Sequence, residues 1–285
     1  MERHAHHGFA CQMTTLLSRT VPQPATRRAA STRRWALAGL LFGVVVAVVA
    51  WAPAHWLASA VQALSQSQVH LDQPRGTVWN GTAQLALAGG SGSSDTVALP
   101  GLVSWRIRPA WGGLSIDLNA SCCTPQPLKI AARATGFSGV HVDLSDHQSS
   151  WPTSLLVGLG TPWNTLQLQG QLAVRSQGLS LDMARDHMAL AGQMEVDALQ
   201  VSSRLSTLKP MGSYRVTLLG GSTPTVQLQT LDGSLQLSGN GQWVGSRLRF
   251  EGLATAQADR IEALSNLLNI IGRRNGASSL IKIGS

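Results

Sequence analysis

The side chains best suited to chemistry lie in one short segment, His141-Val-Asp143-Leu-Ser-Asp146-His147. Imidazole nitrogens and carboxylate oxygens are common zinc ligands. On a strand, His141 and Asp143 share one face, whereas Asp146 and His147 fall in the following turn. Because the segment identifies no third ligand, we expect a polar strand edge here and no metal site.

Motifs of catalytic centres do not occur in the sequence. There is no Gly-x-Ser-x-Gly elbow, P-loop, dinucleotide-binding fingerprint or His-Glu-x-x-His. Asp182, Asp186 and Glu195 do not form a recognisable acid–base pair by their spacing. The missing motifs are only modest evidence against catalysis, and we identify no catalytic residue and no cofactor site in the sequence. A hydrolase of unknown type is the alternative, because catalytic triads are scattered in sequence.

The cysteines are Cys11 and the adjacent pair Cys122 and Cys123. Neighbouring cysteines rarely bond to each other, and the sequence contains no Cys-x-x-Cys metal spacing. We expect the pair to stay unbridged in a turn before Thr124-Pro125. A reactive or intermolecular thiol is the alternative.

The positive charge is concentrated at the N-terminus. The chain has a formal net charge of +8, and only 13% of its residues are charged. Six arginines against Glu2 give residues 1–34 a balance of +5, and the remaining +3 is scattered over residues 35–285. The pattern lacks the dense basic cluster of a nucleic-acid-binding protein.

A long uncharged segment follows this basic tail, since residues 35–71 contain no Asp, Glu, Lys or Arg. Its first part is apolar throughout and, as a helix, is long enough for the ~30 Å hydrocarbon core of a bilayer. The sequence predicts a cytoplasmic tail at 1–34, a transmembrane helix at 35–55 and a periplasmic β-rich domain at 56–285. The anchor residues expected in the membrane are Trp35, Leu40, Phe42, Val46 and Trp51.

The arginines before the apolar segment predict its orientation. Arg27, Arg28, Arg33 and Arg34 precede it, and the next positive charge is Arg75. By the positive-inside rule the N-terminus stays in the cytoplasm and the remainder is exported. The alternative is a cleaved twin-arginine signal, with cleavage near Ala50–Ala54, but the long valine-rich run favours retention as an anchor. Whether residues 1–34 are native or an artefact of the chosen start stays open.

Alternating apolar and polar residues predict strands over most of the chain, as in Val103-Ser-Trp-Arg-Ile107. Turn signals at Gly220-Gly221, Asp232-Gly233 and Gly239-Asn240-Gly241 separate these segments. The predicted fold is mainly β and antiparallel, with one or two short helices.

Helical spacing is confined to a few segments. Residues 54–68 extend the membrane helix or lie along the surface, and 151–158 form a short helix after Pro152. Asp259 is expected to cap a last helix that ends at Gly272. Residues 279–284 are predicted to form the closing strand.

Tryptophan and arginine side chains on the strands are the candidate interaction residues, because both types are typical interface anchors. Their structural alternative is stacking or burial of the side-chain stem. The residues are Trp79, Trp105, Arg106, Arg108 and Trp243.

Several segments in order resemble the type II secretion system protein N family. They include Pro74-Arg-Gly-Thr-Val-Trp-Asn-Gly81, Leu99-Pro-Gly-Leu-Val-Ser-Trp-Arg-Ile-Arg-Pro109, Gly212-Ser-Tyr-Arg-Val-Thr-Leu218, Asp232-Gly-Ser-Leu-Gln-Leu-Ser-Gly239 and Leu267-Leu-Asn-Ile-Ile-Gly-Arg-Arg-Asn-Gly276. The resemblance implies a non-enzymatic inner-membrane component of the machine that exports folded proteins from the periplasm. It also implies contacts with other inner-membrane components and with the outer-membrane secretin.

A second function fits the same pattern of residues. A long sheet with a continuous apolar face curls into a groove for acyl chains as readily as it packs on a core. A membrane-anchored module that binds or transfers lipid is therefore the alternative function.

Overall fold

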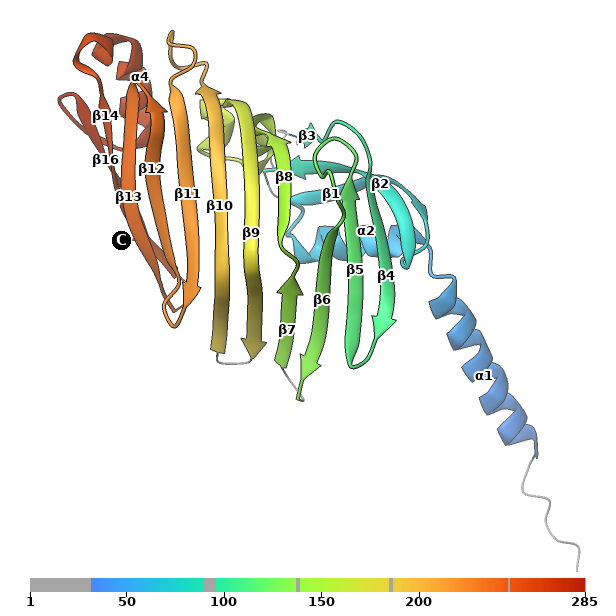
Figure 1. Cartoon of the computed structure of the whole chain (residues 1–285). Helices are drawn as coiled ribbons and strands as arrows, with labels where there is room; N and C mark the ends of the chain where they lie inside the picture. Colours follow the sequence, from blue (N-terminus) through green and yellow to red (C-terminus); the bar gives the residue numbers. More distant parts are fainter. Residues whose placement is uncertain (1–31, 90–95, 137–138, 185–186, 246, 285) are drawn as a thin grey trace, which may run out of the picture. The chain divides into compact units, whose positions relative to one another are not determined.

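A computed structural model describes residues 32–89, 96–136, 139–184, 187–245 and 247–284. The chain divides into two compact units, Met1–Ala47 and Val48–Ser285. Most of helix α1 (Thr32–Ala50) belongs to the first unit, and none of its residues is buried (Figure 1). By length and composition, α1 is a helix that can cross a membrane.

Helix α1 covers a slightly different range from the predicted 35–55. It begins at Thr32, so Arg33 and Arg34 lie in its first turn, and it ends at Ala50 because Pro53 has no N–H for a continuing helix. The predicted anchor residues Trp35, Leu40 and Phe42 are exposed, as Val46 and Trp51 also are. Arg27 and Arg28 lie outside the described residues.

The second unit is a 16-stranded sheet in which all described pairs are antiparallel, which confirms the predicted fold class. Its order is β1-β2-β4-β5-β6-β7-β9-β10-β11-β12-β13-β14-β16-β15, with β3 paired to β2 and β8 paired to β9. The first eight strands are β1 Val69–Gly76, β2 Asn80–Ala88, β3 Thr96–Ala98, β4 Val103–Ala110, β5 Gly113–Ala120, β6 Leu128–Thr135, β7 Gly139–Leu144 and β8 His147–Pro152. The others are β9 Gln169–Ala184, β10 His187–Ser202, β11 Gly212–Gly221, β12 Thr225–Gly233, β13 Leu235–Val244, β14 Arg247–Ala256, β15 Arg273–Asn275 and β16 Ser278–Ile283.

Strand β9 is long enough to hold two partners on the same edge. Its last part pairs with β7, where Asp143 opposes Ser180, and its first part pairs with β8, where His147 opposes Ser176. The segment between β5 and β6 meets β8 through the N–H of Ser150, which donates to the carbonyl of Cys123 over 2.8 Å.

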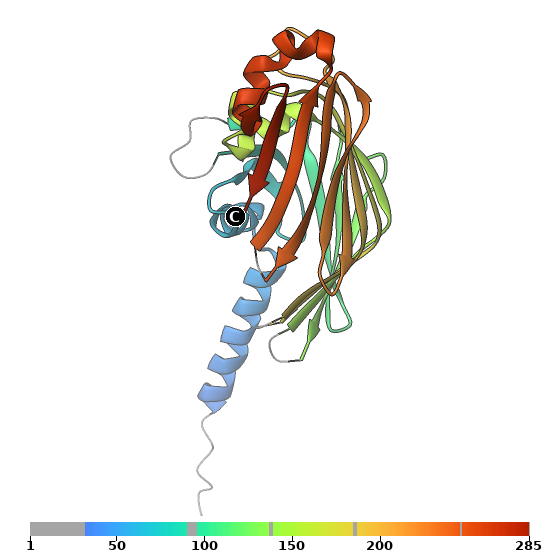
Figure 2. The same ribbon diagram turned by 90° about the vertical axis from the view of Figure 1, so that its left-hand side faces the viewer.

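The sheet is curved, and helices α2, α3 and α4 lie on its concave side (Figures 1 and 2). The helical segments of this unit are α2 Ala54–Leu64, the 3-10 segments η1 Thr153–Leu159 and η2 Ala258–Arg260, α3 Trp163–Leu166 and α4 Ile261–Ile271. Residues 54–64 therefore form a separate helix, and the helix predicted at 151–158 is the end of β8 followed by η1.

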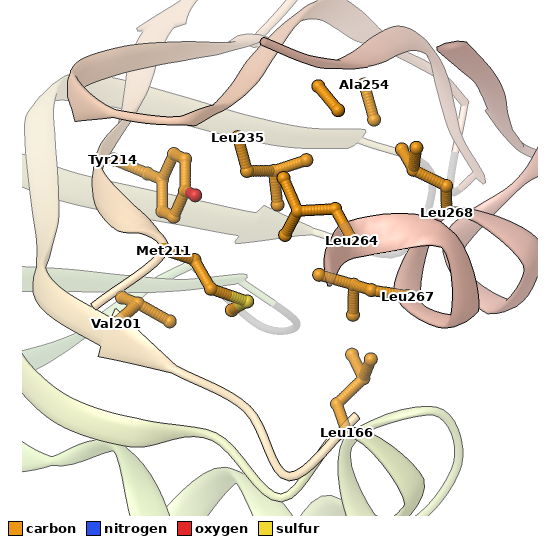
Figure 3. Close-up of a cluster of buried hydrophobic side chains, with 10 residues drawn as sticks. Leu166, Val201, Met211, Tyr214, Leu235, Ala254, Leu264, Leu267 and Leu268 are labelled. Atoms are coloured by element: carbon orange, nitrogen blue, oxygen red, sulfur yellow. The ribbon is translucent and has the colours of Figure 1, made fainter. Parts of the chain in front are cut away.

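Apolar residues of the helical segments pack with residues of the sheet in three cores. The largest core joins Leu264, Leu267 and Leu268 of α4 to Leu166, Met211 and neighbouring strand residues (Figure 3). A second core places Leu155 of η1 against Leu99, and a third places Ala54 of α2 against Trp105. Burying these leucine stripes is the main stabilisation of the concave face.

Two local predictions are wrong, and packing explains both. Gly239-Asn240-Gly241 lies within β13 and makes no turn, because the ring of Phe250 packs over these glycines; a Cβ at Gly239 would lie 2.4 Å from Phe250 Cζ. Asp259 does not cap α4, since it lies in η2 and its carboxylate contacts Arg260 Nε at 3.1 Å. The predicted end at Gly272 and the closing strand are confirmed.

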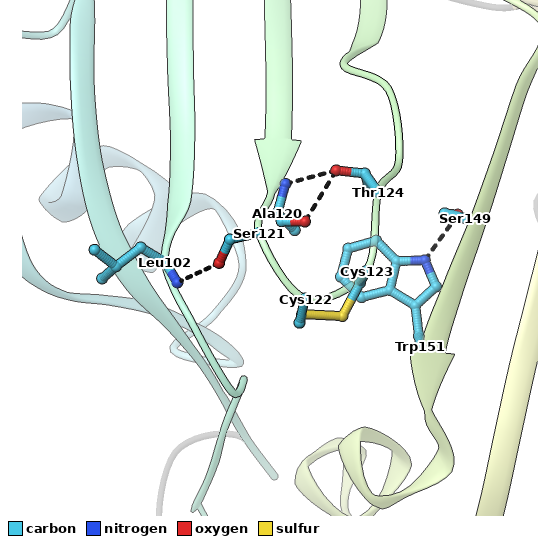
Figure 4. The surroundings of a disulfide bond; sticks show 8 residues. All are labelled: Leu102, Ala120, Ser121, Cys122, Cys123, Thr124, Ser149 and Trp151. Carbon is cyan, nitrogen blue, oxygen red and sulfur yellow. Dashed lines mark hydrogen bonds between the residues drawn. A yellow bond between two sulfur atoms is a disulfide. The ribbon is translucent and has the colours of Figure 1, made fainter.

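The expectation for the adjacent cysteines is also wrong, because Cys122 and Cys123 form a disulfide (Figure 4). They lie in the turn after β5, which Thr124 fixes by donating its N–H and its hydroxyl to the carbonyl of Ala120. Cys123 is buried beside Leu99 and Leu155. Adjacent cysteines generally stay unbridged, but here the disulfide lies in a turn that hydrogen bonds hold in place.

Candidate functional site

Helix α2 does not pack on the sheet along its whole length. Ala54, at its start, is buried at 2% exposure against Ala83 and Trp105. Leu57 and Val61 face the sheet farther along but remain partly exposed. Ala54 is therefore the buried residue of α2, and Leu57 and Val61 border a space between the helix and the sheet.

That space is a cavity of ≈ 390 Å³. Trp105 forms part of its wall and is held there by its indole N–H, which donates to the carbonyl of Val78 over 3.0 Å. Gly81 on the adjacent strand makes room for the ring, since a Cβ there would lie 2.5 Å from Trp105 Cζ2. The apolar lining comes from α2 and from strands β1, β2, β4, β5, β6 and β8: Leu57, Val61, Leu71, Leu85, Val103, Trp105, Ile107, Ile116, Leu118, Leu128 and Trp151.

Four polar side chains occur in the lining: Asn119, Thr124, His147 and Ser149. Thr124 Oγ1 bonds the main chain of Ala120, and Ser149 Oγ accepts the indole N–H of Trp151 over 2.9 Å. His147 Nε2 is buried and has no hydrogen-bond partner among the described residues. A buried nitrogen of this kind costs free energy as long as it stays unpaired.

His147 also lines a second cavity, of ≈ 490 Å³, whose character is polar. Gln126, Asp146 and Gln148 contribute to this wall, together with Arg175 of β9. Asp146 accepts the N–H of Gly178 over 2.7 Å, which fixes the turn between β7 and β8. His147 is thus shared by an apolar cavity and a polar one.

The predicted polar segment is divided by the fold. Asp146 and His147 belong to the cavities, whereas His141 lies between Asp182 and Asp143, whose carboxylate is 2.9 Å from Nε2. Hydrogen bonds to Asp182 and then Asp143 raise the pKa of the His141 imidazole above its ordinary value. Across the described ranges no group of three or more His, Cys, Asp or Glu side chains is placed to hold a metal ion.

The predicted interaction residues occupy three kinds of position. Trp105 is buried at 4% exposure, and Trp243 is half-buried on β13. The indole of Trp79 donates to the carbonyl of Val49 over 2.7 Å. Arg106 is exposed on the opposite face of β4 from Trp105, and Arg108 lies there too, 3.8 Å from Asp117. Of the five predicted residues, only the two arginines are therefore exposed, and the three tryptophans are buried or half-buried.

Trp111 is the exposed aromatic residue that the sequence analysis missed. It lies in the turn between β4 and β5 and is fully exposed, at 101%. The signal was the sequence Pro109-Ala-Trp-Gly-Gly113, in which a tryptophan occupies a two-residue turn and has no strand neighbour to pack on. A tryptophan in this position is available to a partner.

An ion pair lies on the face of β10 that is turned away from the large core. Arg215 donates from Nε and Nη2 to the two carboxylate oxygens of Asp197 over 2.6 and 2.7 Å. These hydrogen bonds lower the pKa of Asp197 below its ordinary value. Arg175 adds a positive charge 3.7 Å from the same carboxylate. The arrangement holds β9, β10 and β11 together, and its Arg175 also lines the polar cavity.

Together, the fold and the site define a class: an antiparallel β domain with an apolar pocket, preceded by one helix able to span a membrane. Residues 67–280 match the family described as type II secretion system (T2SS), protein N, and the chain belongs to this family. The predicted resemblance is thereby confirmed. Searches of curated proteins and of solved structures returned no match.

Proposed function

We propose that the chain is a single-pass inner-membrane component that supports export of folded proteins from the periplasm across the outer membrane. In this proposal α1 is the anchor, the N-terminus is cytoplasmic and the β domain lies in the periplasm. The domain acts by binding other components and carries out no catalytic step. Its partners are other inner-membrane components of the secretion machine and the outer-membrane secretin.

The family match over residues 67–280 carries the proposal, because it covers nearly the whole β domain of a chain that contains a potential membrane span. Membership makes the chain a component of a type II secretion system. The arginines before α1 support the orientation by the positive-inside rule. Tethering to one membrane raises the effective concentration of partners in that membrane, so weak contacts suffice for assembly.

The β4–β5 turn is the docking point that we favour for a protein partner. Trp111 offers a large exposed ring, and Arg108 on the same hairpin is exposed as well. The sheet edge formed by β15 suits this role less. The edge strand β15 has three residues and carries Arg273 and Arg274, and short charged edges resist pairing with another strand.

Deletion of residues 35–285 tests the proposed role in export. We expect exoproteins to accumulate in the periplasm and to disappear from the medium, as measured by immunoblotting of both fractions. Full-length chain supplied in trans should restore export. Normal export in the deletion strain, with no second copy of the family in the genome, would reject the role.

Photocrosslinking in cells tests the docking point and the partners. A photoreactive amino acid at Trp111 should capture a secretion component, whereas the same probe at Gln229, exposed on β12, should not. Crosslinks from Gln229 alone, or from Trp111 to lipid alone, would exclude the hairpin as the docking point. A C-terminal reporter that is active only in the periplasm tests the orientation in the same strain.

A further inference from the structure

We propose that the cavity beneath α2 binds one acyl chain of a fatty acid or membrane lipid, with an oxygen of the head group hydrogen-bonded to His147 Nε2. This inference goes beyond the role in secretion and does not depend on it.

The walls of the cavity select for an aliphatic chain. Val61 of α2 and Leu85, Trp105 and Leu118 of the sheet line it, and the nearby side chains of Thr124 and Ser149 are already hydrogen-bonded. Ligand pockets range from about 300 to 1,000 Å³, and this cavity of ≈ 390 Å³ is near the lower limit. The volume therefore admits a single chain and leaves the second chain of a diacyl lipid outside.

His147 supplies a buried hydrogen-bonding atom beside the cavity. Its Nε2 is buried and without a partner in the described part of the chain. The ring lines both the apolar cavity and the polar cavity that includes Gln126 and Asp146. A ligand with a hydrocarbon tail and a carboxyl, ester or hydroxyl oxygen at one end matches this change from apolar to polar lining. Its oxygen forms a hydrogen bond with the imidazole nitrogen.

The same walls argue against a peptide as the occupant. Every residue of a buried peptide brings an N–H and a C=O that require partners, and the side chains that line the cavity are mostly apolar. An acyl chain needs none along its length. The membrane would be the source of the acyl chain, and α2 follows the apolar helix α1 closely in the sequence, because only Trp51, Ala52 and Pro53 separate the two helices.

The test uses the full chain in phosphatidylethanolamine–phosphatidylglycerol nanodiscs with hexadecanoic acid that carries a diazirine at its methyl end. After illumination, mass spectrometry should find the label on peptides from α2, β4 and β5. A second arm places the diazirine in one acyl chain of phosphatidylethanolamine. Labelling of these peptides in either arm supports the proposal, and the arm that labels identifies free acid or lipid as the source.

Two substitutions in α2 form a matched pair. Val61→Trp places a large ring in the cavity, and excluding about two methylenes lowers labelling roughly tenfold. Leu64→Trp adds the same ring at a position that is 87% exposed and should leave labelling unchanged. Label confined to residues 32–50, or equal labelling of all three proteins, would overturn the proposal.

Substitutions of His147 test the polar end and also serve if Val61→Trp does not fold. His147→Phe keeps an aromatic ring but loses the hydrogen bond, so labelling by the fatty acid should fall roughly two- to twelvefold. His147→Gln, which retains a hydrogen-bonding group, should recover part of it. Labelling by a diazirine-bearing hydrocarbon without a head group should not fall in His147→Phe. If both probes label His147→Phe as strongly as the unaltered chain, His147 has no part in binding.

Discussion

Substitution of Tyr214 tests whether the large core leaves a buried hydroxyl without a hydrogen-bond partner. It is 5% exposed and packs beside Met211 and Leu235 (Figure 3), and its hydroxyl has no hydrogen-bond partner among the described residues. A buried unpaired hydroxyl costs about 1–3 kcal/mol, and the void left by removing it costs about 1 kcal/mol. Tyr214→Phe should therefore raise the free energy of unfolding by about 1 kcal/mol.

The expected change is measurable as a shift of the thermal midpoint. For a domain of this size, 1 kcal/mol corresponds to about 2–4 °C, so Tyr214→Phe should unfold about 2–4 °C higher, in circular dichroism or tryptophan fluorescence. Tyr214→Leu provides the control, since it removes the ring as well and should unfold at a lower temperature. A Tyr214→Phe protein that is less stable than the unaltered chain would show that the hydroxyl has a partner, and the reasoning would fail.

The same residue allows a titration, because the chain contains a single tyrosine. Burial raises the pKa of the Tyr214 phenol well above its usual range. The unfolded chain ionises near pH 10, so unfolding releases a proton and the domain loses stability as the pH rises above that value. Absorbance at 295 nm should show no ionisation near pH 10 until the domain unfolds. A reversible titration near pH 10 in the folded domain would contradict the burial.

Three other substitutions test separate features. Asp197 has a pKa below its ordinary value, so its contribution to stability is present above about pH 4 and is lost as the pH falls through the lower folded value; urea titrations should show a weaker acid dependence for Asp197→Asn. Gly239→Ala places a methyl group against Phe250 and should lower the free energy of unfolding by about 1–3 kcal/mol in the same urea assay; an unchanged free energy would show that the ring can move aside. The Cys122–Cys123 disulfide predicts that iodoacetamide leaves both sulfurs unmodified until a reductant is added, as mass spectrometry can show; modification without reductant would contradict it.

The sequence alone was sufficient for the features that depend on neighbours along the chain. An uncharged apolar run long enough for a bilayer predicts α1, since its composition leaves no polar face. Alternation with a period of two predicts the strands, because successive side chains of a strand point to opposite faces. The stripe of Leu264 and Leu268 and the stop at Gly272 predict α4 for the same local reason.

Only the tertiary structure decided the features that depend on residues far apart. Pairing determines that β7 and β8 share one edge of β9, that Phe250 covers the Gly239 region and that a bonded turn joins Cys122 to Cys123. Alternation indicates an apolar face but not what covers it, since the sequence pattern is the same whether a leucine contacts another side chain or a ligand. The cavity next to His147 lies between α2 and the sheet, where Leu57 and Val61 are only partly buried, and it depends on three-dimensional packing.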